Sequence, residues 1–141
     1  MRKHHIWLRT AALFQVLTGL VHAVSLFVKP QPTNDSEKQL YNLLETYQFN
    51  LGQGFSPTMA DLSLALSSCF TMLYIFGGLL NWHFLGKRAE SRIMKGVLNI
   101  NVLVFGISFG LMVVFTFLPP IILTGLTFIF LFLARYTMPK Y

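Results

Sequence analysis

The sequence predicts an all-α integral membrane protein, a four-helix bundle with a short amphipathic helix in its outer loop. Of its 141 residues, 54% are hydrophobic and 11% are charged, whereas about 25% of residues are charged in an ordinary soluble domain. The mean hydropathy is +0.57. A helix needs about 20 apolar residues to cross a bilayer. The chain therefore has room for four spans and one modest loop in a single domain, residues 1–141.

Four apolar runs supply the expected spans, at about residues 6–28, 59–85, 96–118 and 121–136. The first run follows basic residues, as in a signal peptide. It is longer than the apolar part of a signal peptide and no cleavage site follows it, so we expect it to be retained. Ser56 and Pro57 favour a helix start before the second run. Pro119 and Pro120 stop the third run, and so tight a turn makes spans three and four antiparallel neighbours.

The positions of the basic residues predict the orientation. Only Lys29 and Lys38 lie on the side of the outer loop. The opposite side carries nine basic residues: Arg2, Lys3, Arg9, Lys87, Arg88, Arg92, Lys95, Arg135 and Lys140. Because cytoplasmic loops carry an excess of lysine and arginine, both termini are expected in the cytoplasm.

Residues 29–58 form the only sizeable segment outside the apolar runs. Residues 34–36 offer helix caps, and two glycines, Gly52 and Gly54, are typical of a helix end and a tight return. Between them, apolar residues recur at helical spacing: Leu40, Leu43, Leu44, Tyr47 and Leu51. This amphipathic helix either lies on the outer membrane surface or caps the bundle, or residues 36–51 form a lid over a pocket between the spans.

Four polar side chains are expected to form an outer cluster and a candidate binding site: His22, Ser25, Asp61 and Ser68. With a rise of about 1.5 Å per residue, His22 lies about 10 Å below the outer boundary, at the depth of Ser68. His22 is the only histidine well inside a run, and an ionisable group inside a membrane is a functional candidate. The alternative is a neutral imidazole that donates to Ser25 or to a backbone carbonyl.

An inner cluster of three amides is expected to join the helices as a structural feature: Gln15, Asn81 and Asn101. Amide side chains donate and accept, and such interhelical hydrogen bonds contribute roughly 0.6 kcal/mol each. Gly106 and Gly110 form a Gly-x-x-x-Gly pair, which lets another helix approach closely.

Several function classes are disfavoured. The basic residues flank apolar runs and do not form a phosphate-binding face, so no nucleic-acid partner is expected. His22 and His83 lie at opposite boundaries, so they cannot share a haem, and no ligand set accompanies His4 and His5. No acid lies in the middle of a span, as a proton-coupled exporter would need. We expect no cofactor and no metal.

The pair Gly19-x-x-His22, the amphipathic outer helix ending near Phe49, and the sequence Gly54…Met59-x-Asp61 resemble a group of small four-helix bacterial inner-membrane proteins of unknown function. The resemblance covers residues 10–85. It implies a place in the cell inner membrane and no known activity, and it suggests that His22 and Asp61 belong to one outer site.

The sequence thus predicts a small multi-pass membrane protein with a binding or structural role. Its expected partner is a membrane lipid, a small apolar molecule or another membrane protein, held in an outer-leaflet site around His22. The alternative is a transporter or channel component that acts as a homo-oligomer, with Gly106 and Gly110 at the contact. An interfacial enzyme with His22 as base ranks last, because no nucleophile or metal set accompanies that residue.

Overall fold

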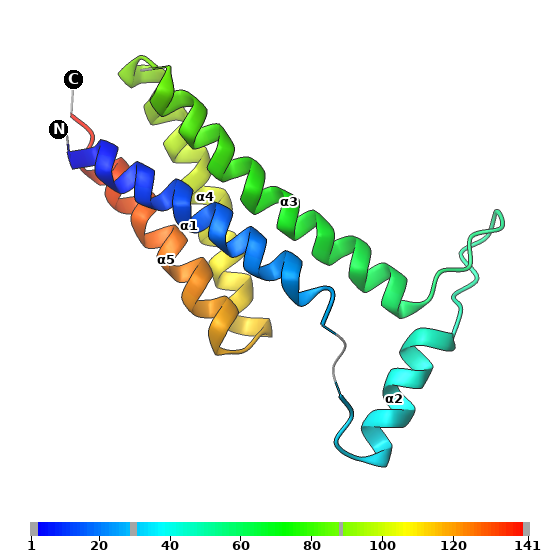
Figure 1. Ribbon diagram of the computed structural model, residues 1–141. Helices are drawn as coiled ribbons and strands as arrows, with labels where there is room; N and C mark the ends of the chain where they lie inside the picture. The colour runs from blue at the N-terminus through cyan, green and yellow to red at the C-terminus, as the bar shows by residue number, and fades with distance from the viewer. Residues whose placement is uncertain (1–2, 29–30, 88, 140–141) are drawn as a thin grey trace.

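The computed structural model describes residues 3–28, 31–87 and 89–139, and these parts of the chain contain five helices and no named strand (Figure 1). The helices are α1 (Lys3–Ser25), α2 (Asp35–Thr46), α3 (Met59–Gly86), α4 (Ser91–Phe115) and α5 (Leu118–Tyr136). Four of them, α1, α3, α4 and α5, are long and apolar enough to cross a membrane. The predicted all-α class and the four helices of membrane length are confirmed.

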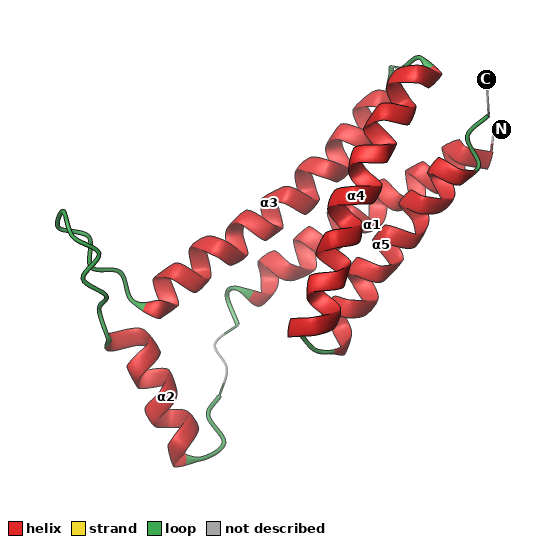
Figure 2. Ribbon diagram, turned by 180° about the vertical axis from the view of Figure 1, so that it is seen from behind, coloured by secondary structure: helices red, strands yellow, loops and turns green. Residues whose placement is uncertain are grey.

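The four long helices lie side by side in the order α3, α1, α5, α4 (Figures 1 and 2). Helix α1 packs between α3 and α5, and α5 packs between α1 and α4. The two termini and the α3–α4 connection lie at one end, while the α4–α5 turn and the segment containing α2 lie at the other (Figure 1). Arg2, Lys29, Arg88 and Lys140, which entered the orientation count, lie outside the described residues.

Much of the apolar surface of these helices has no protein partner. Only 17–33% of the most apolar window of each long helix is buried inside the structure. Exposed large side chains occur along all four helices, such as Val24, Leu66, Val114 and Phe132. A soluble monomer rarely exposes contiguous apolar patches of more than a few hundred Å², so this surface has the chemistry of one that contacts lipid.

The α1–α3 contact depends on residues without side chains. A Cβ atom at Gly78 would lie 2.8 Å from the carbonyl oxygen of Ala12, and one at Gly19 would lie 3.1 Å from that of Thr71. The predicted glycine pair on α4 behaves differently. A Cβ at Gly106 would meet the ring of Phe128 on α5 at 2.9 Å, whereas one at Gly110 would meet nothing within 4 Å. Only the first glycine of the pair therefore lies against another helix of the chain.

The turn between the last two long helices lies earlier than the prolines. Helix α4 ends at Phe115, Thr116 and Phe117 make the connection, and Pro119 and Pro120 lie in the first turn of α5. Proline fits the first helical position because its missing amide hydrogen has no partner there in any helix. The expectation that these prolines form the turn itself is wrong, although α4 and α5 do pack against each other as expected.

Three hydrogen bonds among Thr33, Asn34 and Glu37 cap the N-terminus of the amphipathic helix α2. The side chain of Asn34 accepts from the amide of Glu37 at 2.9 Å, and the Glu37 carboxylate accepts from the Thr33 amide at 2.6 Å and from the Thr33 hydroxyl at 2.9 Å. The backbone bond to Thr33, followed by its hydroxyl bond, lowers the pKa of Glu37. None of the residues of α2 is buried, and the helix extends away from α1, α4 and α5 (Figures 1 and 2).

Candidate functional site

A cavity of about 590 Å³ opens between α1, α3 and the α4–α5 turn. This volume lies within the range of about 300–1,000 Å³ that is usual for small-molecule sites. The fourteen residues that line it include no Asp, Glu, Lys or Arg. They are Thr18, Val21, His22, Ser25, Leu66, Ser67, Phe70, Met112, Thr116, Phe117, Pro119, Pro120, Leu123 and Thr124.

His22 lies on the α1 wall of this cavity, in the last turn of the helix. Its ring meets the ring of Phe70 on α3 edge to face, with centroids 4.8 Å apart, and it faces the backbone of Ser67. Its Nε2 atom is buried and has no hydrogen-bond partner among the described residues. The Ser25 hydroxyl donates to the backbone carbonyl of His22 at 2.6 Å and not to the ring. The imidazole thus keeps one polar atom free for a further contact.

Thr18 lies one turn before His22 on the same wall. Its side chain is 3% exposed, and its Oγ1 atom also lacks a partner within the described parts of the chain. A threonine inside a helix usually satisfies its hydroxyl on a carbonyl one turn back. Thr124, on the α5 side of the cavity, does so by donating to the carbonyl of Pro120 at 2.8 Å. Thr18 and His22 therefore give one wall of the cavity two polar atoms without partners.

Of the predicted outer cluster, the structure brings only His22 and Ser25 to the cavity. Asp61 is the third residue of α3, and its carboxylate accepts from the amide and the hydroxyl of Thr58 at 2.9 and 2.8 Å. The Asp61 amide donates in turn to the Thr58 hydroxyl at 3.1 Å, which completes a capping box. The Ser68 hydroxyl donates to the carbonyl of Leu64 in its own helix. Asp61 and Ser68 are both engaged elsewhere.

Four polar residues of the lining were not among the predicted site residues, namely Thr18, Ser67, Thr116 and Thr124. The signal for Thr18 is its spacing of four residues from His22, which places both on one helix face. Ser67, and not its neighbour Ser68, lines the cavity. Ser67 lies on the same face of α3 as the buried residues Thr71 and Tyr74. The predicted lid is also absent from the lining, because none of residues 36–51 is among the fourteen.

The three inner amides meet in one buried group that joins α1, α3 and α4. The Asn81 amide nitrogen donates to Oε1 of Gln15 at 2.8 Å and to Oδ1 of Asn101 at 3.2 Å. Nε2 of Gln15 donates to the same Asn101 oxygen at 3.2 Å, and Nδ2 of Asn101 donates to the carbonyl of Val97 at 2.9 Å. Gln15 and Asn81 are fully buried, and Asn101 is nearly so. Such an arrangement positions helices relative to one another and leaves little room for a ligand.

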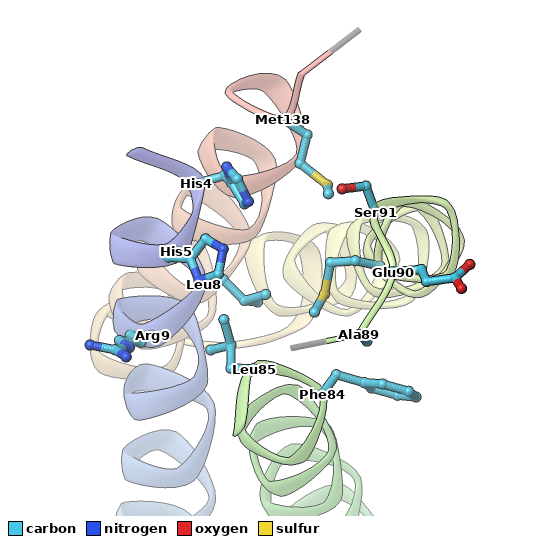
Figure 3. A pocket seen from close by; sticks show the side chains of 11 residues that line it. His4, His5, Leu8, Arg9, Phe84, Leu85, Ala89, Glu90, Ser91 and Met138 are labelled. Atoms are coloured by element: carbon cyan, nitrogen blue, oxygen red, sulfur yellow. The ribbon is translucent and has the colours of Figure 1, made fainter. Parts of the chain in front are cut away.

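A second pocket, of about 420 Å³, lies at the end where the termini meet (Figure 3). His4 and His5 line it from α1 with ring centroids 4.4 Å apart. The charged ends of Arg9 and Glu90 point away from each other. Within the described parts of the chain, no three His, Cys, Asp or Glu side chains lie close enough together to hold a metal ion.

Comparisons of the chain with models of known families, with curated proteins and with solved structures found no match. The resemblance of residues 10–85 to small bacterial inner-membrane proteins stays a prediction. The candidate site is a mainly apolar cavity between α1, α3 and the α4–α5 turn, with two polar atoms on the α1 wall that lack partners among the described residues.

Proposed function

We propose that the protein is a small multi-pass membrane protein that holds an apolar molecule in the cavity beside His22. The observation that carries the proposal is the cavity itself. Among the described residues, its lining is mainly apolar, has no side chain of Asp, Glu, Lys or Arg, and includes two residues with a buried polar atom that lacks a partner. Its rim includes Val21, Leu66 and Phe117, which are exposed. An apolar rim favours entry of a ligand from hydrocarbon and not from water.

The membrane placement that this proposal requires is a four-helix bundle in the cell inner membrane with both termini in the cytoplasm. The outward apolar surface of α1, α3, α4 and α5 supports it. Of the described lysines and arginines, six lie in the first two turns of α1 and α4, at the end of α3 and in the last turn of α5, which share one end of the molecule (Figure 1): Lys3, Arg9, Lys87, Arg92, Lys95 and Arg135. In this orientation the His22 cavity opens in the outer leaflet.

The orientation predicts opposite labelling of two single-cysteine variants. Both carry Cys69→Ser, and one adds Ser36→Cys while the other adds Glu90→Cys. With intact cells and a membrane-impermeant maleimide, we expect the Ser36→Cys variant to react at once and the Glu90→Cys variant to react only after lysis. The parent with Cys69→Ser alone should stay unlabelled in both conditions. Equal labelling of the two variants in intact cells would contradict the proposed topology.

Filling the cavity is expected to expel its occupant. Ser67 lines the cavity from α3, whereas Ser63, four residues earlier on the same helix, is exposed and lies outside the lining. The Ser67→Phe variant places a ring in the apolar space, and Ser63→Phe adds the same ring elsewhere. In native mass spectrometry of protein released from mild detergent, wild type and Ser63→Phe should retain a bound molecule and Ser67→Phe should lose it. Equal retention by all three would remove the cavity as the binding site.

A further inference from the structure

We infer that the occupant of this cavity is an uncharged lipid whose single polar head, a hydroxyl or a carbonyl oxygen, is bound between Oγ1 of Thr18 and Nε2 of His22. The inference rests on the proposed function and specifies the class of ligand. Its hydrocarbon chain would lie against the apolar part of the lining, which includes Phe70, Met112 and Leu123.

Thr18 and His22 lie on the face of α1 that lines the cavity, so one oxygen atom of an occupant can approach both side chains. Thr18 and His22 are four residues apart on one face, so their Cα atoms are separated by about 6 Å along the helix axis. Helical side chains lean toward the helix N-terminus, so the longer side chain of His22 extends back toward Thr18. An oxygen atom within about 3 Å of both polar atoms would have a hydrogen-bond partner on each side.

The chemistry of the two groups admits both kinds of head. A threonine hydroxyl donates and accepts, and a neutral imidazole nitrogen donates in one tautomer and accepts in the other. A lipid hydroxyl can therefore donate to one group and accept from the other, and a lipid carbonyl can accept from both. A fatty or isoprenoid alcohol has one hydroxyl and a hydrocarbon remainder. A diacylglycerol, with a hydroxyl and two esters, and a quinone, with two carbonyls, also place uncharged oxygen atoms at one end of their hydrocarbon.

The described part of the lining disfavours a charged head. A phosphate group in the cavity would find no lysine or arginine among the fourteen lining residues, and burying an uncompensated charge in an apolar site is strongly unfavourable. Water alone is also a poor occupant. The cavity of about 590 Å³ is roughly twenty times the liquid volume of one water molecule. One water molecule could bind the two polar atoms, but the remaining water would lie against an apolar lining that offers few hydrogen bonds.

The test uses the full-length protein in phosphatidylcholine nanodiscs and a photoreactive oleyl alcohol that carries a diazirine on its chain. The probe is expected to crosslink to peptides that contain residues 18–25 and 66–70. Dioleoylglycerol should compete with it, whereas dioleoyl phosphatidic acid, which has the same chains and an added phosphate, should not. A short-chain quinone is a second competitor.

Two variants test the polar contacts. Thr18→Val and His22→Phe keep size and shape but remove the free polar atom, and each should reduce crosslinking about fivefold, the effect of one typical hydrogen bond. Thr127→Val is the matched control, because the Thr127 hydroxyl donates to Leu123 in its own helix and does not line the cavity. Helical content and melting temperature, measured by circular dichroism, establish that each variant is folded.

The outcomes separate this inference from the proposed function. Competition by phosphatidic acid equal to that by dioleoylglycerol, or unchanged crosslinking in both polar variants, would overturn the neutral-head assignment. The proposed function would stand in either case, provided that Ser67→Phe abolishes crosslinking. Crosslinking that Ser67→Phe leaves intact, or that never reaches the cavity peptides in wild type, would overturn both.

Discussion

Replacing Gly78 by alanine is expected to lower the stability of the protein by about 1–3 kcal/mol, the usual cost of forcing extra atoms into a packed contact. The added Cβ would lie 2.6 Å from Cγ2 of Val16 and 2.8 Å from the carbonyl oxygen of Ala12. The valine can change its rotamer, but the carbonyl belongs to the α1 backbone. The new methyl group therefore has to push α1 and α3 apart.

The measurement is unfolding of the purified protein by an increasing mole fraction of sodium dodecyl sulfate in mild detergent, followed by circular dichroism. Gly110→Ala is the matched control on α4, because a Cβ there meets nothing within 4 Å. We expect the control to be as stable as wild type or up to about 1 kcal/mol more stable, since alanine favours a helix over glycine. A Gly78→Ala variant as stable as wild type would contradict the close α1–α3 contact.

The same control bears on the predicted homo-oligomer. Gly106 is engaged by Phe128 within the chain, so Gly110 is the member of the pair left open for a second copy. If two chains pack at this face, Gly110→Ala should weaken self-association, measured by energy transfer between labelled chains in nanodiscs, while leaving the stability of the monomer unchanged. Unaltered self-association would leave Gly110 without a role in an interface.

The helices could be predicted from the sequence because the length of an apolar run is set by the bilayer and does not depend on tertiary contacts. Their ends were less predictable. Lys3, Arg92 and Lys95 are charged and fall outside the apolar runs, yet they continue α1 and α4. Charged residues can extend a helix beyond hydrocarbon. The position of Pro119 was also hard to predict, because proline can both end a helix and occupy the first turn of the next one.

The candidate site was only partly predictable, because depth along a helix says nothing about which neighbour a side chain meets. Depth along the helices places His22 level with Ser68, with Asp61 nearer the outer boundary. Asp61 instead closes the capping box with Thr58, a local pattern that was present in the sequence as Thr-x-x-Asp. The importance of Thr18 depends on the absence of a partner for its hydroxyl among the described residues. That property belongs to the packed helices and cannot be inferred from the residue type.

Replacing Asn81 by leucine is expected to lower the stability of the protein by about 1–2 kcal/mol. Asn81 is the central donor of the inner amide group, since its nitrogen bonds to both Gln15 and Asn101. Leucine has a similar size, so the main loss is of hydrogen bonds. Oδ1 of Asn101 keeps its bond from Gln15, but Oε1 of Gln15 is left buried without that donor. An unsatisfied buried polar group costs about 1–3 kcal/mol. Interhelical hydrogen bonds in membranes contribute at most about 1.7 kcal/mol, so we expect the loss to lie in the lower part of that range.

A double-mutant cycle separates this loss from a simple change of packing. Gln15→Leu removes the acceptor that Asn81→Leu leaves unpaired, and the double variant also takes the second donor from Oδ1 of Asn101. The double variant should therefore differ from the sum of the two single variants by about 0.5 kcal/mol or more. The same cycle between Asn81→Leu and Thr127→Val should be additive, because the Thr127 hydroxyl bonds only within α5. Both cycles are measured by the detergent unfolding described above. Additivity in the Gln15–Asn81 cycle would mean that the two amides do not stabilise each other, and the helices would then be held by apolar packing alone.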